Sequence, residues 1–190
     1  LPIPLTPIQI LWVNFITDGL PGLALASEPG EANVMRRPPR PRGESVFAHG
    51  IWQHILWAGL LIGGVSLAAC ALAIEHGEHP QTMAFTVLTL AQLVHVEAIR
   101  SETQPLWRIG LASNRFMLAT VVASVALHLA IVYVPALQAV FGTEALSPQA
   151  LAFAAALSSL VFFGVEIEKW AVRKGWLYGQ EAAAAEVRFR

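Results

Sequence analysis

Long stretches without charged side chains limit the folds that this sequence can adopt. A helix needs about 20 apolar residues to cross the hydrocarbon core of a bilayer. Five stretches approach or exceed that length, and they cover residues 1–27, 45–74, 79–96, 116–143 and 145–165. Asp18 alone interrupts the first stretch, and the third is expected to continue past Glu97. The sequence therefore predicts an all-α, polytopic membrane bundle of five transmembrane helices.

The basic residues predict how these helices are oriented. Lys and Arg lie between spans one and two, between spans three and four, and after span five. The other two connections, 75–78 and 135–147, contain neither residue. Such alternation is what the positive-inside rule requires. We therefore expect an integral membrane protein with residue 1 outside and residue 190 in the cytosol.

The remaining composition excludes several classes of function. The chain is 55% hydrophobic and 13% charged, with a formal net charge of −1, which gives no reason to expect nucleic-acid binding. Cys70 is the single cysteine, so an internal disulfide is impossible. The sequence opens with Leu1, and we expect it to be part of a longer chain.

Asp18 is the residue that most suggests a function. A charge at bilayer depth costs from about 3 to more than 10 kcal/mol. Asn14 and Thr17 precede it at helical spacing, and Pro21 cannot donate a hydrogen bond to the carbonyl of Thr17. We therefore expect the first helix to be partly unwound, with side-chain and backbone oxygens converging on a cation. A proline-kinked helix whose Asp18 pairs with a neighbour is the structural alternative.

Several motifs point to one family. Gln9-Ile10-Leu11-Trp12-Val13-Asn14, followed by Thr17-Asp18-Gly19-Leu20-Pro21, closely resembles the sixth transmembrane helix of P-type calcium-transporting ATPases. Supporting matches follow in order at Glu28-Pro29, Met35 to Arg40, Thr82 to Phe85, Arg100-Ser101-Glu102, Leu127-His128-Leu129 and Val132-Tyr133-Val134. The resemblance implies that residues 1–178 form transmembrane helices six to ten, the carboxyl-terminal membrane domain, and that 179–190 are a cytosolic tail.

The resemblance also implies the metal ligands. Asn14 and Asp18 match positions that bind the transported ion, and Thr17 matches a position used by two-ion pumps. Gln92 stands where those two-ion pumps have a glutamate, as in secretory-pathway and many bacterial pumps that carry one calcium per cycle. We therefore expect metal ligands at Asn14, Thr17, Asp18 and Gln92, and a site for one ion.

The implied function is that of a transport domain in an ATP-driven calcium pump, with manganese as the alternative ion. The phosphorylated Asp-Lys-Thr-Gly-Thr segment and the nucleotide-binding domain are absent from the sequence. We expect no ATPase activity from this chain alone, because ATP and Mg²⁺ would act through other domains. The expected partners are the remaining transmembrane helices, the cytosolic phosphorylation domain and membrane lipids, and the expected location is a bacterial plasma membrane. The alternative is a stand-alone, pump-derived membrane interaction protein that does not transport.

Other polar and small residues receive structural interpretations. Glu97, Glu166 and Glu168 are expected to be solvated at helix ends, with Lys169 as a partner for the last two. His95 lies one turn from Gln92 and is interpreted either as tuning the site or as a packing residue. The other histidines lack the spacing of metal ligands. Gly59, Gly63 and Gly64 are expected to let helices approach closely.

Overall fold

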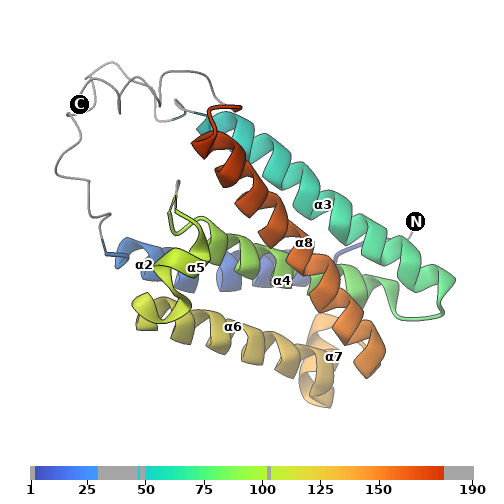
Figure 1. Cartoon of the computed structure of the whole chain (residues 1–190). Coiled ribbons are helices and arrows are strands. Elements are labelled where there is room, and N and C mark those ends of the chain that lie inside the picture. Colours follow the sequence, from blue (N-terminus) through green and yellow to red (C-terminus); the bar gives the residue numbers. More distant parts are fainter. Residues whose placement is uncertain (1–2, 30–46, 48–49, 102–103, 178–190) are drawn as a thin grey trace, which may run out of the picture.

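The computed structural model describes residues 3–29, 47, 50–101 and 104–177, and every regular element within them is helical. The first span consists of α1, a π-helical segment η1 and α2 (Figure 1). The elements in chain order are α1 (Pro7–Asn14), η1 (Phe15–Gly19), α2 (Leu20–Ala26), α3 (Ile51–Glu75), α4 (Pro80–Ala98), α5 (Leu106–Ile109), η3 (Leu111–Ser113), α6 (Arg115–Tyr133), α7 (Pro135–Phe141) and α8 (Pro148–Arg173).

Proline and short polar side chains set most of the helix boundaries. Pro7 and Pro148 occupy first turns, where the missing N–H costs nothing. Thr6 and Gln9 form a reciprocal capping box at the start of α1. Pro135 separates α6 from α7, since it cannot continue the hydrogen bonding of the preceding helix.

Four helical spans are long and apolar enough to cross a membrane: Pro7–Ala26, α3, α6 and α8. The predicted third span is present as α4, a helix of 19 residues in which polar side chains make up a larger share than in the other four. Its membrane crossing stays a prediction. The expected interruption of the first span occurs as η1, in which the backbone bonds i to i+5 just before Pro21.

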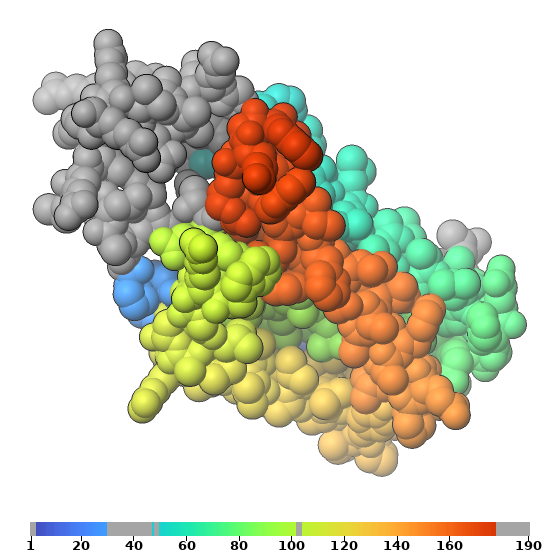
Figure 2. Space-filling model, in the orientation of Figure 1, coloured from blue at the N-terminus to red at the C-terminus, as the bar shows by residue number. Residues whose placement is uncertain are grey.

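α4 is the central helix of the bundle. It packs against α3 and α8 on one side and against α6 and the first span on the other (Figure 1). In the space-filling view, α8 and the segment from α5 to α6 cover most of α4 (Figure 2). Twelve of its 19 residues are buried. Because α4 has neighbours around most of its circumference, its side chains are positioned from several directions.

Hydrogen bonds tie the helix ends together in the alternating order that the sequence predicts. At one end, the side chain of Arg100 bonds Glu28, and the side chain of Asn114 bonds the carbonyl of Ala24. At the other end, Gln9 bonds the carbonyl of Phe141 and Glu144 N–H bonds Thr82. The first end, at which the described Arg and Lys residues gather, is called the basic end below; they are Arg100, Arg108, Arg115, Lys169, Arg173 and Lys174.

Small residues bring the helices close, but they are not the predicted ones. A Cβ added at Gly59, Gly63 or Gly64 would meet nothing within 4 Å, so these glycines do not mediate packing. The close approach occurs at Gly164 of α8, where an added Cβ would lie 2.9 Å from the Cδ2 atom of Leu61. The prediction was wrong because the small residues that α3 buries are Ala58, Ser66, Ala69 and Ala73 rather than its glycines.

This difference between the glycines gives a stability prediction. Gly164→Leu should destabilise the bundle by about 1–3 kcal/mol, because the new side chain enters space that Leu61 and the Trp57 ring already fill. Gly59→Leu is the matched control, since it adds the same atoms at an exposed position of α3. Thermal unfolding in detergent measures both variants. Equal stabilities would contradict the assigned α3–α8 contact.

Candidate functional site

The four predicted ligands lie on two neighbouring elements, η1 with its preceding residue and α4. Thr17 is buried, and its Oγ1 lies 2.7 Å from Gln92 Oε1 and 2.8 Å from the carbonyl oxygen of Val13. Asp18 Oδ1 lies 3.5 Å from the same hydroxyl. Three of the four residues are therefore within reach of one another, across 75 positions in sequence between Thr17 and Gln92.

Asn14 and Asp18 lie on a different face of the first span from Thr17. Both are exposed, whereas Thr17 points into the contact with α4. The π turn explains the difference, because bonding from i to i+5 aligns residues four to five apart and rotates the i+3 position away. The predicted shared face therefore holds for Asn14 and Asp18, while Thr17 forms the edge between that face and Gln92.

The hydroxyl of Thr17 can change its hydrogen-bond acceptor. It has one hydrogen, so it donates to Val13 or to Gln92 but not to both at once. When it donates to Val13, the oxygens of Thr17 and Gln92 both have free lone pairs. Two oxygens 2.7 Å apart can lie together at the roughly 2.3–2.6 Å ligand distance of a calcium ion.

The site is made of oxygen atoms. Among the described residues, no group of three or more His, Cys, Asp and Glu side chains is arranged to hold a metal ion. Asp18 therefore supplies a carboxylate next to neutral hydroxyl and amide oxygens. Such a donor set matches a hard cation such as calcium or manganese and does not match zinc or copper.

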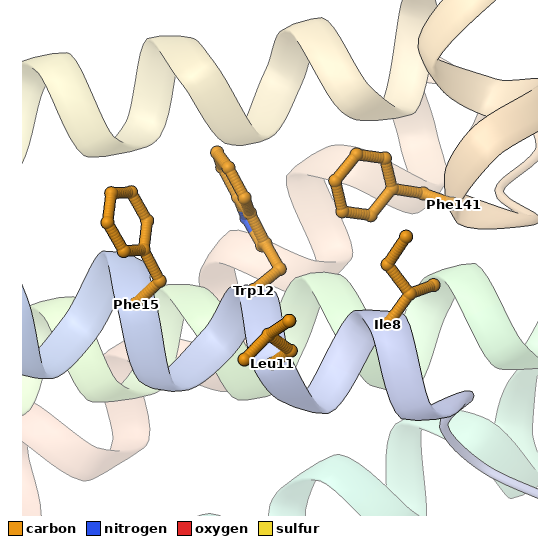
Figure 3. A pocket seen from close by; sticks show the side chains of 5 residues that line it. All are labelled: Ile8, Leu11, Trp12, Phe15 and Phe141. Atoms are coloured by element: carbon orange, nitrogen blue, oxygen red, sulfur yellow. The ribbon is translucent and has the colours of Figure 1, made fainter.

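A separate pocket lies beside the first span and has a different character. It has a volume of about 360 Å³ and is lined by Ile8, Leu11, Trp12, Phe15 and Phe141. Figure 3 shows the Trp12 ring between the rings of Phe15 and Phe141. An apolar lining offers no oxygen to a hydrated ion, so this pocket is no part of the candidate cation site.

Three glutamates that the sequence suggested were solvated are buried and paired. Glu97 contacts Arg100 at 3.3 Å, and Glu166 contacts Lys169 at 3.1 Å, the partner expected for it. Glu168 accepts hydrogen bonds from Trp57 and His54. The prediction was wrong because Leu106 N–H bonds Glu166, the start of α3 bonds Glu168, and Glu97 pairs with the buried Arg100. Local sequence carries no signal for such long-range cover.

Arg100 holds the basic end of the first span. Its buried guanidinium donates to both oxygens of Glu28, at 3.0 and 2.8 Å, and Asn114 donates to Glu28 at 2.8 Å. Burial raises the pKa of Glu28, but the hydrogen bonds from Arg100 and Asn114 outweigh it and leave the pKa lowered. Burial likewise lowers the pKa of Arg100, and its bonds to Glu28 and Glu97 raise it overall.

Comparison with known proteins identifies the family. Residues 2–171 match the family described as cation transporting ATPase, C-terminus. The chain belongs to this family. It is 42% identical over 152 residues to a calcium-transporting ATPase of Bacillus subtilis. The aligned region covers 78% of this chain and 17% of that protein.

Fungal and animal relatives give the same result. The chain is 36% identical over 170 residues to calcium-transporting ATPase 1 of Yarrowia lipolytica, covering 88% of this chain and 18% of the relative. It is 37% identical over 173 residues to calcium-transporting ATPase type 2C member 2 of Mus musculus, covering 89% of this chain and 18% of that relative. The chain therefore spans less than a fifth of the length of these relatives. It is an integral membrane domain of a cation-transporting ATPase.

The Glu28–Arg100 contact predicts a pH-dependent stability. Glu28→Gln should cost about 1.5–3 kcal/mol at neutral pH, because charged hydrogen bonds to Arg100 are replaced by neutral ones. The lowered pKa of Glu28 means that its contribution is complete above about pH 4.3, the ordinary value, and is lost as pH falls through the folded-state pKa. Denaturation of both proteins between neutral and acid pH measures this. A difference that persists at the lowest pH would contradict the assignment.

Proposed function

We propose that this chain is the transport domain of an ATP-driven calcium pump and that Asn14, Thr17, Asp18 and Gln92 form one wall of its ion site. The observation that carries the proposal is the exposed carboxylate of Asp18, 3.5 Å from the hydroxyl that contacts Gln92. It lies inside a helix that is apolar enough to cross a membrane. The names of the relatives support calcium as the cargo.

The π turn gives the site its geometry. Hydrogen bonding from i to i+5 widens the backbone between Phe15 and Gly19 and turns Thr17 toward α4. Asp18 then projects from the adjacent, exposed face of the same turn, which it shares with Asn14, and its Oδ1 stays 3.5 Å from the Thr17 hydroxyl. A cation bound at Asp18 would reach the oxygen pair of Thr17 and Gln92 by a small shift of side chains. π-bulges inside α-helices are frequent at functional sites.

The energy for transport would come from outside the described helices. ATP and Mg²⁺ would act at a cytosolic phosphorylation domain, and its conformational change would reach the ion site through the basic end. That end would face the cytosol, in accordance with its Arg and Lys residues. The remaining transmembrane helices would supply further ligands, and the expected membrane is a bacterial plasma membrane. Manganese accepts the same oxygen donors and is the alternative cargo.

A second candidate function is a pump-derived membrane interaction protein that does not transport. The exposed apolar residues of the first span, including Leu11 and Phe15, would suit a helix-binding surface. The exposed Asp18 favours the transport function. A helix that covered this face would bury the carboxylate, and in a purely structural interface that burial costs free energy without a compensating ligand.

Asp18→Asn tests the ion site in the complete pump. The variant should lower apparent calcium affinity by more than about 100-fold, since even changes behind the ligands cost about 10–100-fold. Calcium-dependent phosphorylation by ATP should be lost at micromolar calcium. Glu75→Gln, which removes an exposed carboxylate at the far end of α3, is the matched control. Unchanged calcium dependence of the Asp18 variant would refute the assignment.

The neutral side chain of Gln92 predicts how many calcium ions the pump binds per cycle. With a neutral amide at this position, we expect one calcium ion per phosphoenzyme and no cooperativity of binding, because a second divalent ion lacks the carboxylate to balance its charge. Glu97 cannot substitute, since it is buried and paired with Arg100. Isotope binding with filtration measures the ratio. Two ions per active pump would contradict the single-ion site.

A further inference from the structure

Two histidines on different helices meet between α3, α4 and α8. The Nε2 atoms of His54 and His95 are 3.1 Å apart, with nearly parallel ring planes at 18°. His54 Nδ1 lies 2.6 Å from Glu168 Oε2, and Trp57 donates to Glu168 Oε1 at 2.7 Å. Four side chains from three helices thus form a continuous chain of hydrogen bonds, called the cluster below. They are His54, Trp57, His95 and Glu168.

The hydrogen positions follow from the chemistry of the partners. An ionised carboxylate only accepts, so His54 Nδ1 carries a hydrogen and donates it to Glu168. In neutral His54, Nε2 is then an acceptor, and the hydrogen in the 3.1 Å contact belongs to His95 Nε2. In this state the two rings are neutral and the cluster carries the single negative charge of Glu168.

One further proton fits this arrangement without breaking a hydrogen bond. The proton adds to the free lone pair of His95 Nδ1, and the hydrogen on His95 Nε2 moves across the short contact to His54 Nε2. His95 ends as a neutral ring protonated at Nδ1. His54 becomes an imidazolium that donates to His95 and to Glu168 at once. One proton has entered, and the charge of the cluster has changed from −1 to zero.

A second proton does not fit. It would place a hydrogen on both Nε2 atoms, which are 3.1 Å apart and would then repel each other. The alternative is to protonate Glu168, which would remove the carboxylate that holds the imidazolium. The geometry therefore limits the uptake to one proton.

We propose that His54, His95 and Glu168 form a binding site for a single proton inside the membrane domain. The charged groups described near it lie on α8 and at the end of α4, and Lys169 is close enough to Glu168 for their charges to interact. On α8, Glu166 pairs with Lys169 and Arg173 lies near that lysine; at the end of α4, Glu97 pairs with Arg100. Proton binding at this site is independent of which ion the pump carries.

Proton uptake has a structural consequence. The neutral N–H···N contact becomes a charge-assisted bond, which is about twice as strong as a neutral one, and the bond from His54 to Glu168 now joins two opposite charges. The protonated state therefore holds α3, α4 and α8 together more firmly. His95 lies three residues beyond Gln92 on α4, so the helix that carries a candidate ligand also carries the proton site.

Nitrogen NMR of ¹⁵N-histidine in the full 190-residue chain, reconstituted in lipid nanodiscs, tests the proposal. His54 and His95 should change together with one common midpoint, and the sum of their signals should correspond to one proton. Glu168→Gln should move that midpoint down by at least about one pH unit, because it removes an opposite charge that favours the protonated form. His76→Gln, at an exposed turn, is the matched control and should leave the midpoint unchanged.

Two independent transitions, each of one proton, would overturn the proposal, as would an unchanged midpoint in Glu168→Gln. Trp57→Phe keeps the test decisive if the Glu168 variant does not fold. It removes a hydrogen bond that stabilises the carboxylate but leaves the proton site intact. The common midpoint should then rise, and a midpoint that stays fixed or splits would equally refute a shared proton.

Discussion

The bundle depends on the pairing of polar side chains along α4. An unpaired polar group away from water costs several kcal/mol. α4 avoids this cost by contacting a different neighbour at almost every turn. Thr82 accepts from Glu144 N–H, Thr86 meets His128, Gln92 meets Thr17, and His95 meets His54. These contacts reach α6, the first span and α3, so they help to fix the positions of these three spans relative to the central helix.

The parts of the structure that the sequence predicts are those that depend on local properties of the chain. Runs without charge give the four strongly apolar spans within a few residues, because length and hydropathy are local properties. Basic residues on alternate connections predict the up-and-down order. The prolines predict the breaks near residues 21 and 135, since a missing N–H ends regular bonding wherever it occurs.

What the sequence does not predict is long-range. His54 lies 41 positions from His95 and 114 positions from Glu168 in the sequence. No spacing rule connects residues so far apart. The buried state of Glu97, Glu166 and Glu168 depends on segments that pack over them from elsewhere in the chain. The outward orientation of the α3 glycines depends on the rotation of that helix, which its nearly uniform apolar sequence does not define.

The proposed ion site differs from the rest of the bundle in one physical respect. Thr17 and Gln92 satisfy each other, as the other polar groups of α4 do, but Asp18 presents its carboxylate on an exposed face. Together with Asn14, these side chains offer at most five oxygens and one negative charge, whereas calcium takes six to eight oxygens. A divalent ion at this wall therefore requires ligands from a facing element. The energetic cost of holding Asp18 in a membrane is offset only when both sides of the site are filled, which would couple ion binding to the approach of the facing helices.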